Sequence, residues 1–181
     1  SCVIVVGETG SGKTTQLPQL LLQCDCSRVV VTQPRRVAAI AAARRVAEEM
    51  GSTVGEAVGY AVRFEHATSE ATKITFVTDG VLLRQAVAHP DMHQYEALVL
   101  DEAHERSLNT DVLFALARRV LVNQRATSIS PTRGLQRVVV ASATLNVEKL
   151  RRYFLNAPVV HVPGRCFPVD VMHVAQPLSS N

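Results

Sequence analysis

Short apolar runs rich in valine, isoleucine and leucine recur along the chain, and each is followed by a polar turn and a stretch with helical periodicity. The runs are continuous rather than alternating, which is typical of strands buried on both faces. The predicted strands cover residues 2–6, 28–32, 73–78, 97–100 and 137–141, with 57–64 as a candidate for another. The predicted helices cover residues 13–23, 35–50, 79–88, 107–123 and 147–155.

The alternation of strands with helices predicts how these elements assemble. Strand–helix–strand units build a parallel sheet with right-handed crossovers. We therefore expect an α/β domain of three layers over residues 1–157, with a mainly parallel central sheet flanked by helices. Residues 124–136, which contain Ser, Thr, Pro and Gly, predict a surface loop. Residues 158–181, broken by prolines, predict an exit segment.

Composition supports one folded domain and argues against several other classes of protein. Of the 181 residues, 47% are hydrophobic and 19% are charged, which favours a full core over disorder. No run of about 18 apolar residues is present, so we expect no membrane partner. Four unevenly spaced cysteines do not make a disulfide framework, so we expect reduced thiols in an intracellular protein.

Charge and aromatic content bear on nucleic-acid binding. The formal net charge of +3 is compatible with a polyanionic partner without requiring one. Aromatic residues make up only 4% of the chain and tryptophan is absent, which argues against a binder built on base stacking. Any contact with a nucleic acid is therefore expected to run through the backbone phosphates.

A glycine-rich turn between the first predicted strand and helix carries a phosphate-binding pattern. Residues 7–14 fit G-x-x-x-x-G-K-[ST], in which backbone N–H groups and a helix N-terminus converge on phosphates. Lys13 is expected to reach the β and γ phosphates, and the Thr14 hydroxyl to bind Mg²⁺. A plain glycine turn does not explain these two residues. The other candidate nucleotide-binding residues are Gly7, Glu8, Thr9, Gly10, Ser11, Gly12 and Thr15.

Two acidic residues come after a buried strand and offer the second half of such a site. Asp101 and Glu102 lie directly after the run 97–100, where ligands of open α/β sheets bind. We expect Asp101 to hold Mg²⁺ mostly through water, and Glu102 to orient and deprotonate an attacking water. With Thr14, they are the candidate metal-binding residues. The alternative, an acidic pair at a helix start, is weaker beside the glycine-rich turn.

Three further polar residues are candidates for coupling the nucleotide site to movement. His104 lies two residues after the expected base, which suggests a contact with the γ-phosphate region or with residues 142–144. Ser142 and Thr144 end the strand 137–141, where they could instead cap the next helix. A surface histidine is the alternative for His104.

Taken together, these segments resemble the first RecA-like domain of the DEAH-box RNA helicases of superfamily 2. The resemblance rests on residues 7–16, Thr32-Gln33-Pro34-Arg35-Arg36, Thr78-Asp79-Gly80, Asp101-Glu102-Ala103-His104 and Ser142-Ala143-Thr144, in that order. It implies a RecA-like P-loop NTPase domain that uses ATP, and other nucleoside triphosphates, with Mg²⁺. It also implies that Lys13, Glu102 and His104 act in catalysis.

The resemblance further implies a path for RNA over the segments 32–36 and 78–80. The RNA-facing candidates are Thr32, Arg35, Arg36, Arg63, Thr78 and Asp79. Arginines are natural phosphate donors, and cations in the first turn of a helix oppose its dipole, which favours an anionic partner for Arg35 and Arg36. A solvated helix start is the alternative. The pairs at 44–45, 118–119 and 151–152 are expected to lie on ordinary solvated helix faces.

The resemblance also implies partners beyond this chain. Helicases of this kind act through a second RecA-like domain, whose arginine fingers are worth roughly 10³–10⁵ in rate. The chain begins inside an apolar run, so we expect it to belong to a longer protein. Without the arginine fingers of the second domain, the 181-residue chain is expected to be nearly inactive alone. Expected partners are RNA, the second RecA-like and accessory C-terminal domains, and an activator protein. A DNA-directed helicase of the same superfamily and a nucleotide-switched RNA clamp remain open, as does the choice of nucleus, cytoplasm or mitochondrion.

Overall fold

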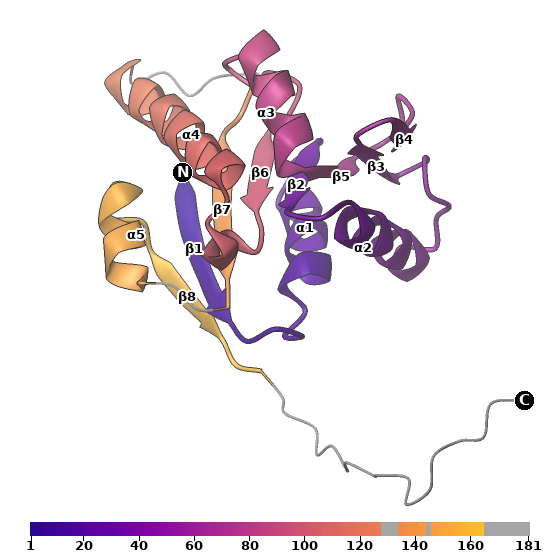
Figure 1. Ribbon diagram of the computed structural model, residues 1–181, viewed down its shortest axis with the longest axis horizontal. Helices are drawn as coiled ribbons and strands as arrows, with labels where there is room; N and C mark the ends of the chain where they lie inside the picture. The colour runs from indigo at the N-terminus through magenta and orange to yellow at the C-terminus, as the bar shows by residue number, and fades with distance from the viewer. Residues whose placement is uncertain (128–133, 144–145, 165–181) are drawn as a thin grey trace, which may run out of the picture.

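A mostly parallel sheet runs through the part of the chain that the structure describes, residues 1–127, 134–143 and 146–164. In this computed structural model, eight strands from those residues lie in the order β4-β3-β5-β2-β6-β7-β1-β8 (Figure 1). They are β1 (Cys2–Gly7), β2 (Val29–Gln33), β3 (Val58–Val62), β4 (Glu65–Ala67), β5 (Ile74–Thr78), β6 (Ala97–Leu100), β7 (Arg137–Ser142) and β8 (Val159–Val162). Neighbouring strands pair in parallel except β3 and β4, which form an antiparallel hairpin.

Helices cover both faces of this sheet. They are α1 (Lys13–Gln23), α2 (Arg36–Glu49), α3 (Asp79–Ala88), α4 (Leu108–Thr127) and α5 (Val147–Tyr153), with a 3-10 turn η1 (Ala103–Glu105) before α4. Residues of α1 and α2 pack on one face of the sheet, and residues of α3, α4 and α5 on the other (Figure 1). The predicted three-layer α/β architecture is thus confirmed. Within the described residues, no helix combines the length and apolarity that a membrane crossing requires.

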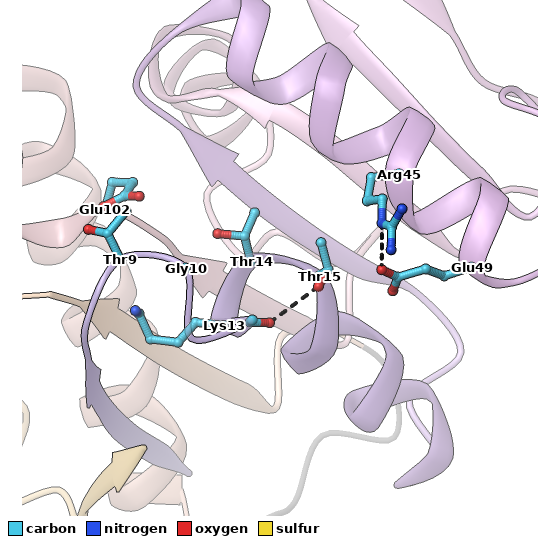
Figure 2. Close-up of a pocket in the computed structure, with 9 residues that line it drawn as sticks. Thr9, Gly10, Lys13, Thr14, Thr15, Arg45, Glu49 and Glu102 are labelled. Carbon is cyan, nitrogen blue, oxygen red and sulfur yellow. Dashed lines mark hydrogen bonds and ion pairs between the residues drawn. The ribbon is translucent and has the colours of Figure 1, made fainter. Parts of the chain in front are cut away.

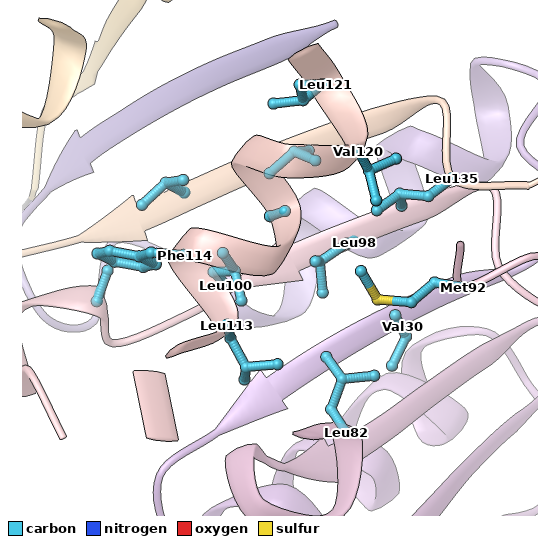
Figure 3. Close-up of a cluster of buried hydrophobic side chains, with 14 of the residues drawn as sticks. Val30, Leu82, Met92, Leu98, Leu100, Leu113, Phe114, Val120, Leu121 and Leu135 are labelled. Carbon is cyan, nitrogen blue, oxygen red and sulfur yellow. The ribbon is translucent and has the colours of Figure 1, made fainter. Parts of the chain in front are cut away.

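The central strands supply both halves of the core. Val30 of β2 packs with α3 and α4, in the cluster of Figure 3, whereas Val29 and Val31 pack towards α1 and α2. All residues of β2 and β6 are buried, because helices cover both of their faces. This double burial is the physical reason for the continuous apolar runs in the sequence.

Three segments differ from their predicted structure. Residues 124–127, predicted in a loop, continue α4. Val159–Val162, predicted in the exit segment, form β8 and pair with β1. The candidate strand over 57–64 is shorter and leads through Phe64, with a φ of 67°, into the hairpin strand β4. Hydrogen bonding to neighbours, rather than local composition, sets these boundaries. The remainder of the predicted loop and exit segment, 128–133 and 165–181, lies outside the described residues.

The parallel strands all have their carboxyl ends at one edge of the sheet. The segments that come after β1, β2, β5, β6 and β7 therefore meet at that edge, as in other open α/β sheets. These segments, with the strand ends before them, carry all the candidate residues except Arg63, which comes after β3. The topology thus brings to one edge residues that lie up to 135 positions apart in the chain, such as Gly7 and Ser142.

Candidate nucleotide site and adjoining edge

The turn after β1 forms a loop that leads directly into α1. Gly10 and Gly12 both have a φ of 84°, in the left-handed region where a side chain is strained. Gly12 directly precedes α1 and has no side chain with which to cap it. The first N–H groups of the helix are therefore accessible to an anion, which the helix dipole also favours.

Lys13 lies inside this loop, with only 8% of its surface exposed (Figure 2). Its Nζ donates hydrogen bonds to the carbonyl oxygens of Gly7 (2.6 Å) and Glu8 (2.7 Å) and to Ser11 Oγ (3.1 Å). None of these acceptors is a carboxylate, so the loop holds the ammonium group without neutralising its charge. The positive charge stays available to a phosphate bound in the loop.

Asp101 joins three segments at the end of β6. It is 2% exposed, and its Oδ2 accepts hydrogen bonds from Thr14 Oγ1 and from Gln33 Nε2, each at 2.6 Å. Its Oδ1 accepts from the backbone N–H of Glu102 at 2.9 Å. A buried carboxylate needs such partners to remain charged. Thr14 and Asp101, both candidate metal-binding residues, are therefore in direct contact, and their metal-binding role stays a prediction. The hydrogen bond from Gln33 to Asp101 was not expected from the sequence.

Glu102 is placed differently from its neighbour Asp101. Its φ of 49° is left-handed, and its side chain is 30% exposed beside the loop. Burial raises the pKa of the Glu102 carboxyl above its ordinary value, and the charge of Asp101 raises it further, while His104 and Lys13 oppose the shift. A carboxylate with a raised pKa is a better proton acceptor near neutral pH, as a general base requires.

The coupling candidates lie close to this pair. His104 is in η1, where its Nδ1 is 3.3 Å from Glu102 Oε2 without hydrogen-bond geometry. Ser142 is fully buried at the end of β7, next to Val6 of β1, and its Oγ has no hydrogen-bond partner in the described structure. Thr144 lies outside the described residues. The coupling role of these residues stays a prediction.

A cavity of about 340 Å³ opens beside the loop (Figure 2). Its walls come from the loop and α1, from the end of β6 and from α2. The described residues that line it are Thr9, Gly10, Gly12, Lys13, Thr14, Thr15, Arg45, Glu49 and Glu102. Most of the predicted nucleotide-binding residues therefore border one space, while Gly7, Glu8 and Ser11 act from the loop as the partners of Lys13.

The α2 wall of the cavity was not expected from the sequence. Arg45, predicted on an ordinary solvated helix face, lines the cavity and donates from Nε to Glu49 Oε1 at 2.8 Å. The carboxylate of Glu49 also accepts from Gln16 (3.1 Å) and Gln19 (2.8 Å) of α1. The hydrogen bond from Arg45 is the main reason that the pKa of Glu49 is lowered. No local signal marks Arg45, because its position depends on how α2 packs beside α1.

Four of the six predicted RNA-facing residues reach the surface at this edge of the molecule. Arg35 precedes α2 and lies 3.4 Å from Glu105, with 77% of its side chain exposed. Arg36 is 51% exposed and pairs with Glu65 of β4 at 3.3 Å. Arg63 is exposed at the turn of the β3–β4 hairpin, and Thr78 is half-buried at the start of α3.

The prediction is wrong for the other two candidates, Thr32 and Asp79, because both side chains are buried. Thr32 is fully buried in β2, between Val77 of β5 and Leu100 of β6. Asp79 is 4% exposed, and its Oδ2 accepts hydrogen bonds from Thr110 Oγ1 (2.5 Å) and from a second hydroxyl of the segment that precedes α4. Neither side chain is accessible to an RNA strand bound on the surface of this structure. The neighbouring strands and helix cover them, which a linear motif does not reveal.

Comparison with known proteins agrees with this arrangement. Over residues 1–153 the chain matches the DEAD/DEAH box helicase family, and it belongs to that family. The α/β architecture with its mostly parallel sheet is the RecA-like fold of such helicases. The chain is accordingly a helicase-type ATP-binding domain, and its family implies the use of a nucleotide and Mg²⁺ in general.

Proposed function

Proceeding from this family membership, we propose that the chain is the first RecA-like domain of an ATP-dependent RNA helicase of the DEAH-box type. In the proposal, the domain binds ATP and Mg²⁺ and works with a second RecA-like domain of the same protein to move or remodel RNA. The observation that carries it is the junction at Asp101. One carboxylate contacts both Thr14 of the phosphate loop and Gln33 of the predicted RNA-binding segment.

The residues around the loop fit a triphosphate with its metal ion. Thr14 Oγ1 and Asp101 Oδ2 lie 2.6 Å apart, and hydroxyl and carboxylate oxygens are ligands that Mg²⁺ prefers. These two residues would hold the ion, and Glu102, which lines the same cavity as Thr14, is the third candidate ligand. When bound, Mg²⁺ neutralises phosphate charge. Lys13 binds the β and γ phosphates in the proposal, which requires it to exchange loop carbonyls for phosphate oxygens.

Glu102 is the proposed general base. Its side chain lines the cavity, and its raised pKa suits it to take a proton from a water that attacks the γ-phosphate. His104, 3.3 Å away, favours the charged form of that carboxylate. Three hydrogen bonds to its carboxylate keep Asp101 in position.

RNA is the proposed second ligand, bound at the same edge of the sheet. Arg35, Arg36 and Arg63 offer guanidinium groups to phosphates, and Thr78 offers a hydroxyl. Arg35 and Arg36 each form an ion pair at the surface, and such pairs contribute little stability. A phosphate can therefore readily replace the carboxylate in each pair. The tetrad Asp101-Glu102-Ala103-His104 supports the DEAH-box assignment.

The test is RNA-stimulated ATP hydrolysis by the longer protein that contains this chain, compared with its Glu102→Gln variant. We expect RNA to stimulate the unmodified protein and the variant to bind ATP without turnover. Equal stimulation by DNA of the same sequence would contradict the proposed preference for RNA, because the 2′-hydroxyl is the group that lets a protein distinguish RNA from DNA. ATP-dependent RNA binding without hydrolysis in the unmodified protein would favour a clamp instead.

A further inference from the structure

The beginning of α4 and α5 line a second, larger cavity. Both helices lie on the sheet face opposite α1 and α2 (Figure 1). Its volume is about 790 Å³, and its described lining residues include none of those around the nucleotide cavity. The residue Arg106 before α4 and Phe114 of α4 form one wall. Lys149, Leu150 and Tyr153 of α5 form the other. The proposed reaction uses none of these side chains.

The apolar part of this cavity is formed by aromatic and aliphatic side chains. Phe114 and Leu150 are 4% and 6% exposed, whereas Tyr153 is 38% exposed. A guanidinium lies near each ring, that of Arg106 at 5.8 Å from the Phe114 centroid and that of Arg118 at 5.4 Å from the Tyr153 centroid. An apolar pocket edged by cations is suited to an apolar side chain with anionic neighbours.

The charges around the cavity are predominantly positive. The carboxylate of Asp111 is already bound by Arg106 through contacts of 2.6 and 3.0 Å. Glu148, the single acidic residue of α5, is shared between Arg152 and the arginine before it. Lys149 forms no ion pair with any residue in the described ranges. An incoming carboxylate therefore meets Lys149 directly. At Arg152 it would displace Glu148 from an exposed ion pair, which contributes little stability.

We propose that this cavity is a docking site for an acidic peptide segment of a partner protein. The segment inserts an aliphatic or aromatic side chain against Phe114 and Leu150 and sets its carboxylates beside Lys149 and Arg152. Charge complementarity selects an anionic partner, and the buried apolar wall favours a peptide over a nucleic-acid strand, which binds mainly through phosphates. Apolar anchors in such pockets typically dominate peptide affinity. The site goes beyond the proposed function and requires neither nucleotide nor RNA.

The test is a selection of displayed random dodecapeptides that bind the 181-residue chain. Peptides that also bind the Lys149→Glu/Arg152→Glu variant are removed in each round. We expect enriched peptides that combine an aliphatic or aromatic residue with several aspartates or glutamates. Fluorescein-labelled copies should bind the unmodified chain at least about tenfold tighter than the variant in fluorescence anisotropy. Tyr153→Ala should weaken the same peptides severalfold without changing the net charge. Both substituted chains are checked by their thermal unfolding midpoint.

A matched control uses exposed cations that are not among the described lining residues of the cavity. Lys73→Glu/Arg84→Glu reverses two charges elsewhere and should leave peptide binding unchanged, because only local charges contribute once salt screens the rest. Enriched peptides that bind all variants equally, or the absence of acidic peptides among those enriched, would overturn the proposal. Weaker oligouridylate binding by the Lys149→Glu/Arg152→Glu variant, without acidic peptides, would replace the peptide by a nucleic acid.

Discussion

The carboxyl ends of β5 and β6 are alike in sequence and differ in the folded chain. Each strand is followed by a buried aspartate, Asp79 with 4% and Asp101 with 2% of its surface exposed. Each aspartate accepts a short hydrogen bond from a threonine hydroxyl, from Thr110 at 2.5 Å and from Thr14 at 2.6 Å. The surroundings then diverge, because the start of α4 covers Asp79, whereas Asp101 lies beside the phosphate loop.

Asp79 and Asp101 are both buried and hydrogen-bonded, so these two properties do not by themselves identify the carboxylate that lies at the nucleotide site. Asp79 joins two helices and does not line the described nucleotide cavity at this edge. Asp101 is followed by Glu102, whose left-handed backbone directs its side chain to the cavity. The proposed general base, Glu102, is the partly exposed neighbour with the raised pKa. The buried aspartates hold their surroundings in place.

The largest effect should come from Glu102→Gln in the proposed protein that has both RecA-like domains. We expect RNA-stimulated ATP hydrolysis to fall by about 10²–10⁴-fold, because a general base is lost while the phosphate loop is untouched. Steady-state phosphate release measures the rate, and a fluorescent ATP analogue measures binding. A hydrolysis rate within a fewfold of that of the unmodified protein would show that Glu102, like Asp79, takes no part in the reaction.

Replacing each aspartate by alanine tests the comparison directly. Asp79→Ala and Asp101→Ala each leave buried donors without an acceptor, so each should lower the free energy of unfolding by about 1–3 kcal/mol. Only Asp101→Ala should also abolish the Mg²⁺ dependence of nucleotide binding. Urea unfolding and nucleotide titrations with and without Mg²⁺ separate the two effects. An equal loss of nucleotide binding in both variants would contradict the assigned difference.

The exposed arginines at the same edge should report on RNA phosphates. Arg35→Ala and Arg63→Ala should each weaken binding of single-stranded RNA and reduce the slope of log K against log salt by about 0.7. Anisotropy titrations at several salt concentrations give that slope. Arg119→Ala, a change of the same charge on α4, is the control and should leave the slope as it was.

The pH dependence of stability should distinguish Glu102 from an ordinary surface carboxylate. Its pKa is raised above 4.5 in the folded chain, so protonated Glu102 favours folding, and this contribution is lost as the pH rises through the folded value. Relative to the unmodified chain, Glu102→Gln should therefore become more stable between about pH 4.5 and neutral pH. Urea unfolding at several pH values measures the difference, and parallel curves would contradict the raised pKa.

The smallest effect is expected at Thr32, which lies between the two compared strands. Its buried Oγ1 has no hydrogen-bond partner in the described structure, so Thr32→Val removes an unsatisfied hydroxyl at similar volume. Stability should stay within about 1 kcal/mol of the unmodified chain or rise slightly. RNA affinity should not change. A clear loss of RNA binding with unchanged stability would restore Thr32 to the RNA path.

Much of the nucleotide site was predictable from short-range patterns. The glycines at 10 and 12, Lys13 and Thr14 are close in sequence, and the conformation of a loop between strand and helix depends mainly on those residues. Asp101 and Glu102 were predictable because a buried parallel strand delivers the residues after it to the shared edge of the sheet. These expectations needed only the direction of the strands.

Residues that act through distant contacts were not predictable in the same way. Gln33 reaches Asp101 across 68 positions, and Arg45 lines the nucleotide cavity because α2 packs beside α1. Thr32 and Asp79 carry the residue types of a binding motif and are nonetheless covered by neighbouring elements. Burial depends on the whole packing arrangement, so the sequence of a five-residue segment contains little information about it.

By itself, the sequence determined the succession of strands and helices, the parallel sheet and the phosphate loop, because periodicity and glycine conformation act over a few residues. Only the tertiary structure decided that Val159–Val162 extend the sheet. It also decided that Asp101 contacts the phosphate loop through Thr14, whereas Asp79 connects α3 to α4 through Thr110. The packing of α4 and α5 likewise decided that these helices line a second cavity. These features arise from side chains and backbone groups that meet only when remote segments pack, and packing has no local signature.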